Sequence, residues 1–269
     1  MIDRLIRTPT ALIGLGLTLA LVAVAVVAEQ IAPYDPLVIV GPPLSAPNMT
    51  FLMGTDDLGR DLFSGVLMGT RTSLAIAMGV GTLTLLIGTT VGLAAGFWGG
   101  LTDDVLMRVT ELFQVIPRFF LAIVVIALFG PGLDRLIIVL GLTSWTTLAR
   151  IVRAQTLSIR EREFIEAARS LGLKESRIVR HHVLPNVLPA ALVMLALVMG
   201  QALLLEASLG FLGLGDPNAI SWGFLAGQAQ RFLRVAWWLS LFPGLALGWA
   251  VLAFNLLSDG LNELRPPRA

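Results

Sequence analysis

The chain has 269 residues, of which 56% are hydrophobic and only 14% are charged. A soluble domain is usually about 45–50% apolar, so this composition favours a membrane protein. The net charge of +1 argues against a basic surface for nucleic acid, and the lack of cysteine excludes disulfides and thiolate chemistry.

Six stretches are candidates for membrane-spanning helices, each of which needs about 20 residues. The first has an apolar run of 18 residues after Arg4 and Arg7, longer than the core of about 7–15 in a signal peptide, so we expect a retained span. The third is purely apolar only over residues 119–129 and has to include polar turns from Leu112 onward. The sequence predicts an all-α, polytopic transmembrane bundle of about six spans, at residues 10–28, 73–97, 112–129, 133–149, 187–209 and 236–257.

The connection between the first two spans is rich in proline, which disfavours regular structure. We expect residues 29–72 to be mostly irregular and to lie outside the cell. The chain then divides into residues 1–72, the first helix with this proline-rich stretch, and residues 73–269, the core.

Glycines recur every four residues on the second span, at Gly88, Gly92 and Gly96. They share one helical face and let another helix backbone approach closely. Plain packing and a sliding contact are both compatible with this pattern.

The distribution of lysine and arginine predicts the orientation, because these residues concentrate in cytoplasmic loops. With the N-terminus inside, the inner segments hold fourteen basic residues and the outer segments hold five. Both termini are therefore expected in the cytoplasm. Eight of the fourteen lie in the stretch 150–185, which becomes a charged cytoplasmic segment.

Part of this segment, EFIEAARSLGLKESRIVRHHVLPN at 163–186, has helical periodicity. Phe164, Ala168 and Leu171 fall on one stripe, Gly172 suits a left-handed helix C-cap, and Pro185 should end a second helix. The expected product is two short helices at an angle. Such helices could dock into a partner's groove or lie on the anionic inner leaflet, and the pattern alone leaves both possibilities open.

The same stretch resembles the EAA loop of bacterial ABC importer permeases, which has the pattern Glu-Ala-Ala, three residues, Gly, then nine residues to an aliphatic position and Leu-Pro. His182 stands at the aliphatic position, which departs from the pattern. The stretches MGTDDLGRDLFSGVLMGTRTSL, GFWGGLTDDVLMRVTELF, EASLGFLGLG and SDGLNELRPP are similar to the peptide/nickel branch, the dipeptide and oligopeptide C-type permeases. The residues that match the EAA pattern are Glu166, Ala167, Ala168, Gly172, Leu184 and Pro185.

This resemblance implies a type I ABC importer permease fold in a bacterial inner membrane. It also implies two cytosolic ABC ATPases that receive the EAA helices, a homologous second permease and an external solute-binding protein. The solute would be a di- or oligopeptide, or a related nickel chelate, opine or glutathione. ATP would be bound by the ATPases, because the chain has no G-x-x-x-x-G-K-[ST] loop and its only lysine is Lys174. No cofactor of the chain itself is expected.

One acidic residue, Glu206, lies within the apolar fifth span. A charge at this depth has to face protein or a water-filled cavity. Glu206 is thus either a structural residue bonded to a neighbouring segment or a candidate for the substrate path.

Two other classes of function are weaker. An intramembrane enzyme would need a Ser/His pair, paired aspartates or H-E-x-x-H in a span, and the predicted spans have none. A membrane scaffold without a transport path is the second alternative. No metal site is expected, because His181 and His182 are adjacent and point about 100° apart on a helix.

Overall fold

The computed structural model describes residues 8–264, and this range forms helices and loops without a β-strand. Five helices are long and apolar enough to cross a membrane, and one bent pair of helices raises the number to six. The prediction of an all-α bundle with about six spans is confirmed. The long helices are α2 (Pro9–Ile31), α3 (Leu62–Trp98), α4 (Gly100–Val115), α5 (Arg118–Phe129), α6 (Leu133–Arg160), α9 (Leu184–Phe211) and α11 (Trp238–Glu263).

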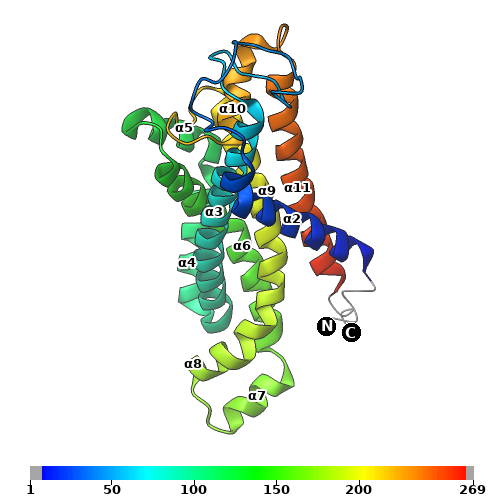
Figure 1. Ribbon diagram of the computed structural model, residues 1–269. Helices are drawn as coiled ribbons and strands as arrows, with labels where there is room; N and C mark the ends of the chain where they lie inside the picture. Colours follow the sequence, from blue (N-terminus) through cyan, green and yellow to red (C-terminus); the bar gives the residue numbers. More distant parts are fainter. Residues whose placement is uncertain (1–7, 265–269) are drawn as a thin grey trace.

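The bundle is elongated, with α3, α6 and α9 along its middle (Figure 1). Helices α4 and α5 lie on one side, and α2 and α11 lie on the other. The proline-rich segment, residues 33–61, covers one end together with α10 (Trp222–Ala229). The opposite end carries α7 (Glu163–Ser170), α8 (Glu175–Ile178) and the π-helical turn η1 (Val179–Val183).

The predicted glycine face of α3 packs against α6. A Cβ atom at Gly88 would lie 2.9 Å from the Leu148 side chain, and one at Gly96 would lie 2.7 Å from the Thr156 side chain. At Gly92 it would lie 2.5 Å from the Ala149 carbonyl oxygen. The close approach of two helix backbones is confirmed, and it makes α3 and α6 the central pair of the bundle.

The second span begins earlier than predicted, at Leu62 instead of residue 73. The Asp61 side chain caps the helix, because its carboxylate accepts the Ser64 N–H at 2.8 Å. The division of the chain at residue 72 therefore falls inside α3. Polar residues such as Arg71 interrupt the apolar pattern here, so hydropathy did not predict the first turns of α3.

The third predicted span is two helices rather than one, with α4 and α5 bent by 73°. Pro117 lies at the break, and Ile116 before it has an extended backbone with φ −80° and ψ 118°. A proline disfavours the helical conformation for its predecessor, which ends α4 at this point. Arg108 and Arg118 therefore lie in the bent pair rather than in a loop, and Arg4, Arg7, Arg265 and Arg268 of the charge count lie outside the described residues.

Pro185 does not end a helix, contrary to the prediction. The chain passes from α8 through η1 directly into α9, and the Leu184 N–H donates to the Val179 carbonyl. A proline lacks a backbone N–H and crowds the carbonyl four residues before it, and a wide π turn accommodates both effects. The segment between α6 and α9 is thus joined to α9 without a break.

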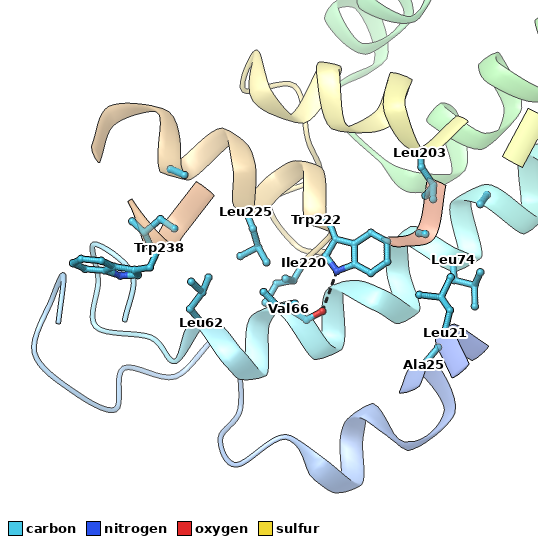
Figure 2. Close-up of a cluster of buried hydrophobic side chains, with 14 of the residues drawn as sticks. Leu21, Ala25, Leu62, Val66, Leu74, Leu203, Ile220, Trp222, Leu225 and Trp238 are labelled. Atoms are coloured by element: carbon cyan, nitrogen blue, oxygen red, sulfur yellow. Dashed lines mark hydrogen bonds between the residues drawn. The ribbon is translucent and has the colours of Figure 1, made fainter. Parts of the chain in front are cut away.

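The largest apolar cluster forms around Trp222, at the start of α10, a helix that the sequence did not predict (Figure 2). Trp222 is fully enclosed, and its indole N–H donates to the Val66 carbonyl of α3 at 3.1 Å. Trp238 anchors the proline-rich segment in a similar way, because its indole N–H donates to the Thr55 carbonyl at 3.2 Å.

The beginning of α2 lies against the end of α11. The Thr10 hydroxyl donates a hydrogen bond to the Glu263 carboxylate at 2.7 Å. Gly14 packs so closely against the backbone at Leu257 that a Cβ atom would not fit there. Two ends on the same side of a membrane require an even number of crossings. This agrees with counting α4 and α5 together as one span.

Candidate functional site: the segment between α6 and α9

Residues 161–183, which we name the projecting segment, extend beyond the rest of the bundle (Figure 1). Helix α6 leads into it as one uninterrupted helix of 28 residues. Helix α9 leaves it through the π turn. The projecting segment is therefore attached directly to two long helices of the bundle, and a force applied to it reaches both.

Helix α7 ends at Gly172 with a left-handed turn, as predicted. Gly172 has φ +78°, its N–H donates to the Arg169 carbonyl at 2.9 Å, and the Leu173 N–H donates to the Ala168 carbonyl at 3.2 Å. These two bonds define a Schellman motif. The turn sets the angle between α7 and α8 that the sequence led us to expect.

The apolar residues of α7 divide into two faces. Ile165 and Ala168 are buried, whereas Phe164 is exposed and Leu171 is 82% exposed. The predicted single stripe is therefore wrong, because neighbouring positions of a short helix separate into an inner and an outer side. The inner side packs into a cluster with Leu93 and Phe97 of α3, Leu148, Val152 and Ile159 of α6, Ile178 and Val183 of the projecting segment, and Val187 and Ala191 of α9.

The six residues that match the EAA pattern take up different environments. Ala168 belongs to the buried cluster, and Leu184 packs against it at the start of α9. The side chains of Glu166 and Ala167 and the Gly172 turn are exposed along α7, and Pro185 is exposed in the first turn of α9. The exposed members leave a shallow outer surface on α7, and the buried members fix its position.

Arg169 ties α7 to two other elements, a role that the sequence did not indicate. Its guanidinium bonds the Glu175 carboxylate at 3.0 Å and lies 5.5 Å from the centre of the Phe97 ring. A cation over an aromatic face is attracted to the ring. Neither partner has a helical spacing from Arg169, so no local pattern could have revealed the contacts.

The two histidines lie on the π turn. The His181 ring nitrogen Nδ1 is 3.2 Å from the Arg177 carbonyl oxygen, and His182 is partly exposed. Within residues 8–264, no three His, Cys, Asp or Glu side chains are grouped closely enough to hold a metal ion.

Glu206 lies near the end of α9, where its carboxylate approaches Gly223 of α10. Its carboxylate is buried, and one oxygen accepts the Ser221 hydroxyl at 2.5 Å. Ser221 in turn caps α10 by accepting the Phe224 N–H at 3.0 Å. Among the described residues, the second carboxylate oxygen of Glu206 has no hydrogen-bond partner. Glu206 thus supports the first turn of α10 and keeps one unused acceptor.

Comparisons with known proteins agree with this architecture. Residues 88–269 match the family described as binding-protein-dependent transport system inner membrane component, and residues 1–56 match the N-terminal TM domain of oligopeptide transport permease C. The dipeptide transport system permease protein DppC of Alkalihalophilus pseudofirmus is 38% identical over 84% of this chain and 74% of the relative. The glutathione transport system permease protein GsiD of Pectobacterium atrosepticum is 35% identical over 98% of this chain and 89% of the relative.

A solved structure of the MetNI methionine ABC transporter in an inward-facing conformation has the same fold. It superposes with a TM-score of 0.63 at 20% identity, over 76% of this chain and 98% of the compared one. The sequence matches and this shared fold lead to one assignment. The chain belongs to the family of inner membrane components of binding-protein-dependent transport systems and is an ABC importer permease of the peptide branch.

Proposed function

We propose that this permease carries short peptides into the cell and that the projecting segment couples it to a cytosolic ATPase. The relatives named for dipeptide and glutathione transport support the solute class, since glutathione is itself a tripeptide. One observation carries the coupling role: the inner face of α7 belongs to an apolar cluster that includes residues of α3, α6 and α9, while its outer face is exposed. A rigid projection of this kind suits docking in a partner's cleft.

A helix lying flat on the membrane is the competing role for α7. The exposed face would then be expected to be basic, because anionic lipids attract lysine and arginine. Instead Glu161, Glu163, Glu166 and Glu175 alternate with the basic residues, and all four are exposed. Mixed charge favours a protein partner over a lipid surface.

The docking proposal is tested by Ala167→Trp, which fills the shallow outer surface of α7. The matched control is Ala154→Trp, the same exchange at an exposed position of α6. We expect the Ala167 variant to insert normally but to lose co-purification with the ATPase, whereas the control keeps it. Retention of the ATPase by both variants would rule out docking through this face.

The complete importer in this proposal contains a homologous second permease, two ATPases and an external solute-binding protein. Vesicles that contain all of them should hydrolyse ATP faster when the binding protein carries a dipeptide. A membrane scaffold would show no such stimulation, and an intramembrane enzyme would act without the ATPases. Mass spectrometry of the ligand that co-purifies with the binding protein identifies the solute.

The proposed orientation has both termini and the projecting segment in the cytoplasm. The chain lacks cysteine, so single cysteines can be placed without background. Asn48→Cys in the proline-rich segment should react with an impermeant maleimide applied to intact cells, and Ser170→Cys should react only after lysis. The reverse pattern would contradict both the orientation and the coupling role.

For Glu206 we propose a place on the substrate path: the unused carboxylate oxygen, which is buried in this conformation, is the group that would meet the solute's amine once it is uncovered. The competing role is support of α10 through Ser221. Glu206→Gln removes the charge but keeps the shape, and Ser221→Ala removes the support but keeps the charge. The path role predicts reduced uptake for Glu206→Gln alone, with normal assembly. Equal loss in both variants favours the structural role.

A further inference from the structure

The corner between α3 and α4 is made by two glycines. Gly99 has φ +64° and Gly100 has φ +54°, a backbone region that favours glycine. A Cβ atom at Gly100 would meet no heavy atom within 4 Å, so the conformation and not the space requires glycine there. The geometry of the corner is therefore set by its own backbone and by the contacts that hold the helices on either side.

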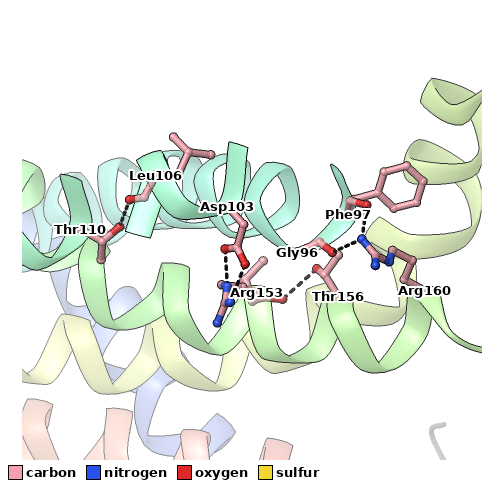
Figure 3. Close-up of polar contacts among 9 residues, drawn as sticks. Gly96, Phe97, Asp103, Leu106, Thr110, Arg153, Thr156 and Arg160 are labelled. Atoms are coloured by element: carbon pink, nitrogen blue, oxygen red, sulfur yellow. Dashed lines mark hydrogen bonds and ion pairs between the residues drawn. The ribbon is translucent and has the colours of Figure 1, made fainter. Parts of the chain in front are cut away.

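Two arginines of α6 make these contacts, one with the end of α3 and one with the start of α4 (Figure 3). Arg160 donates to the Phe97 carbonyl at the end of α3, at 2.9 Å. Arg153 forms a two-point ion pair with Asp103 in the first turn of α4, with both distances at 2.5 Å. The two arginines are seven residues apart, about two helical turns, so they project from the same face of α6.

Both contacts also match the electrostatics of the helix ends. A cation is favoured at the carbonyl end of α3, and an anion is favoured in the first turn of α4. The Arg153 and Asp103 side chains are 34% and 15% exposed, so water screens this pair less than it screens a surface pair. A two-point pair also fixes direction, which a single contact does not.

Helix α4 has few other attachments to the chain. Of its sixteen residues, all of them within the described range, only Thr110 is buried. Leu101 and Val115 are about 80% exposed, and the clearest packing contact is between the Phe113 and Trp145 rings, 5.6 Å apart. The position of α4 thus depends on the glycine corner and on the ion pair to Arg153 more than on a packed core.

We propose that Arg153 and Arg160 are positioning residues that make α4 follow α6 when the ATPase moves the projecting segment. Helix α6 continues into that segment, and its two arginines hold the corner from both sides. Without them the corner is a hinge, and α4 loses its link to the moving helix. This inference rests on the proposed coupling role of the projecting segment.

The test uses the complete importer in lipid nanodiscs and measures distances between pairs of spin labels. One pair joins α4 to α11, through Val105→Cys and Leu252→Cys, and the other joins α6 to α11, through Ser158→Cys and Leu252→Cys. All three positions are exposed. Each pair is measured without nucleotide and after trapping with ADP and vanadate.

In the otherwise unmodified importer, we expect trapping to shift both distances. In the Arg153→Met and Arg160→Met double variant, the α6 shift should remain and the α4 shift should be lost. Arg153→Lys combined with Arg160→Met keeps the charge at position 153 and should retain part of the α4 shift that the double methionine variant loses. The control is Arg150→Met on α6, because Arg150 makes no ion pair or side-chain hydrogen bond in the part of the chain that the structure describes.

The outcomes separate the two proposals. An α4 shift that persists in the double variant would overturn the positioning role and leave the coupling role intact. If neither distance responds to trapping in the unmodified importer, the coupling role fails and this inference fails with it. Retained co-purification of the ATPase with the double variant shows that a lost α4 shift does not come from misfolding.

Discussion

The proline-rich segment forms no helix, whereas the projecting segment at the opposite end is mostly helical. The first is fastened by directional bonds from its backbone: the Trp238 indole reaches the Thr55 carbonyl, and the Tyr34 N–H reaches the Ser64 hydroxyl at 3.2 Å. The second is fastened by the buried side chains of Ile165 and Ala168. Hydrogen bonds to backbone groups distinguish the first end, although Leu44 and Met53 also pack on the core, whereas apolar contacts predominate at the second, where Arg169 adds a contact with the Phe97 ring.

This difference has a mechanical meaning. Hydrogen bonds weaken steeply when their angle or length changes, so a segment held by them keeps one position. Apolar contacts are not directional and tolerate a small tilt. A fixed cap at one end and an adjustable helix at the other suit an importer whose proposed driving force arrives from the ATPase side.

The largest expected effect is on the proline-rich segment. Trp238→Ala removes a buried indole and leaves the Thr55 carbonyl without its donor, which should lower the free energy of unfolding by about 3–5 kcal/mol. The neighbour Trp237 is 55% exposed, so Trp237→Ala is the control and should cost much less. Thermal unfolding in detergent and protease cleavage within residues 33–61 measure both. Equal effects of the two substitutions would show that the Trp238 side chain does not hold the proline-rich segment in place.

At the other end, Ile165→Ala should loosen the projecting segment by about 2–4 kcal/mol, since it empties a fully buried site in the cluster shared with α3, α6 and α9. Leu171→Ala, on the exposed side, should have almost no effect. Amide hydrogen exchange of residues 161–183 reports the loosening directly. Unchanged exchange in the Ile165 variant would mean that the apolar contact does not hold the segment.

A smaller effect is expected at the Gly172 turn. Gly172→Val forces a branched side chain into the left-handed region, which costs about 1–2 kcal/mol. Gly172→Asn should cost less, because asparagine tolerates this conformation. In the order Gly, Asn, Val at position 172, the helix content of α7 should decrease and its amide exchange should become faster. Equal values for Asn and Val would contradict the role of the backbone angle.

The smallest effect concerns pH in the proline-rich segment. Burial raises the pKa of Asp56 above its ordinary value of 3.8, although the backbone N–H groups of Arg60 and Leu58 oppose the shift. The folded segment therefore keeps a proton at pH values where the unfolded chain has lost it. From 3.8 up to the raised pKa, this residue makes the free energy of unfolding fall as the pH rises. Asp56→Asn should remove that slope, and an unchanged slope would contradict the assignment.

Local rules predicted the features that neighbouring residues determine. The number of spans followed from hydropathy, the Gly172 turn from the preference of glycine for a positive φ, and the close-packing face of α3, though not its partner α6, from glycine spacing. The early start of α3, the bend at Pro117 and the helix α10 were missed, because polar residues interrupt the apolar runs there and burial by distant segments decides the structure.

The candidate site shows the same limit. The EAA pattern marked α7, but which of its faces is buried depends on α3 and α6, so Ala168 and Ala167 could not be separated from the sequence. Arg153 and Asp103 are fifty residues apart, and no spacing links them. Contacts between charged residues this distant appear only when the fold is known.

Helix α6 is also a lever. Its 28 residues give a length of about 42 Å at a rise of about 1.5 Å per residue, and no proline interrupts it. A rotation of about 10° around its midpoint would displace each end by about 4 Å, in opposite directions. A small angular change at the projecting segment would thus reach the far face of the membrane as a reversed movement of comparable size, without any bending or unwinding of the helix.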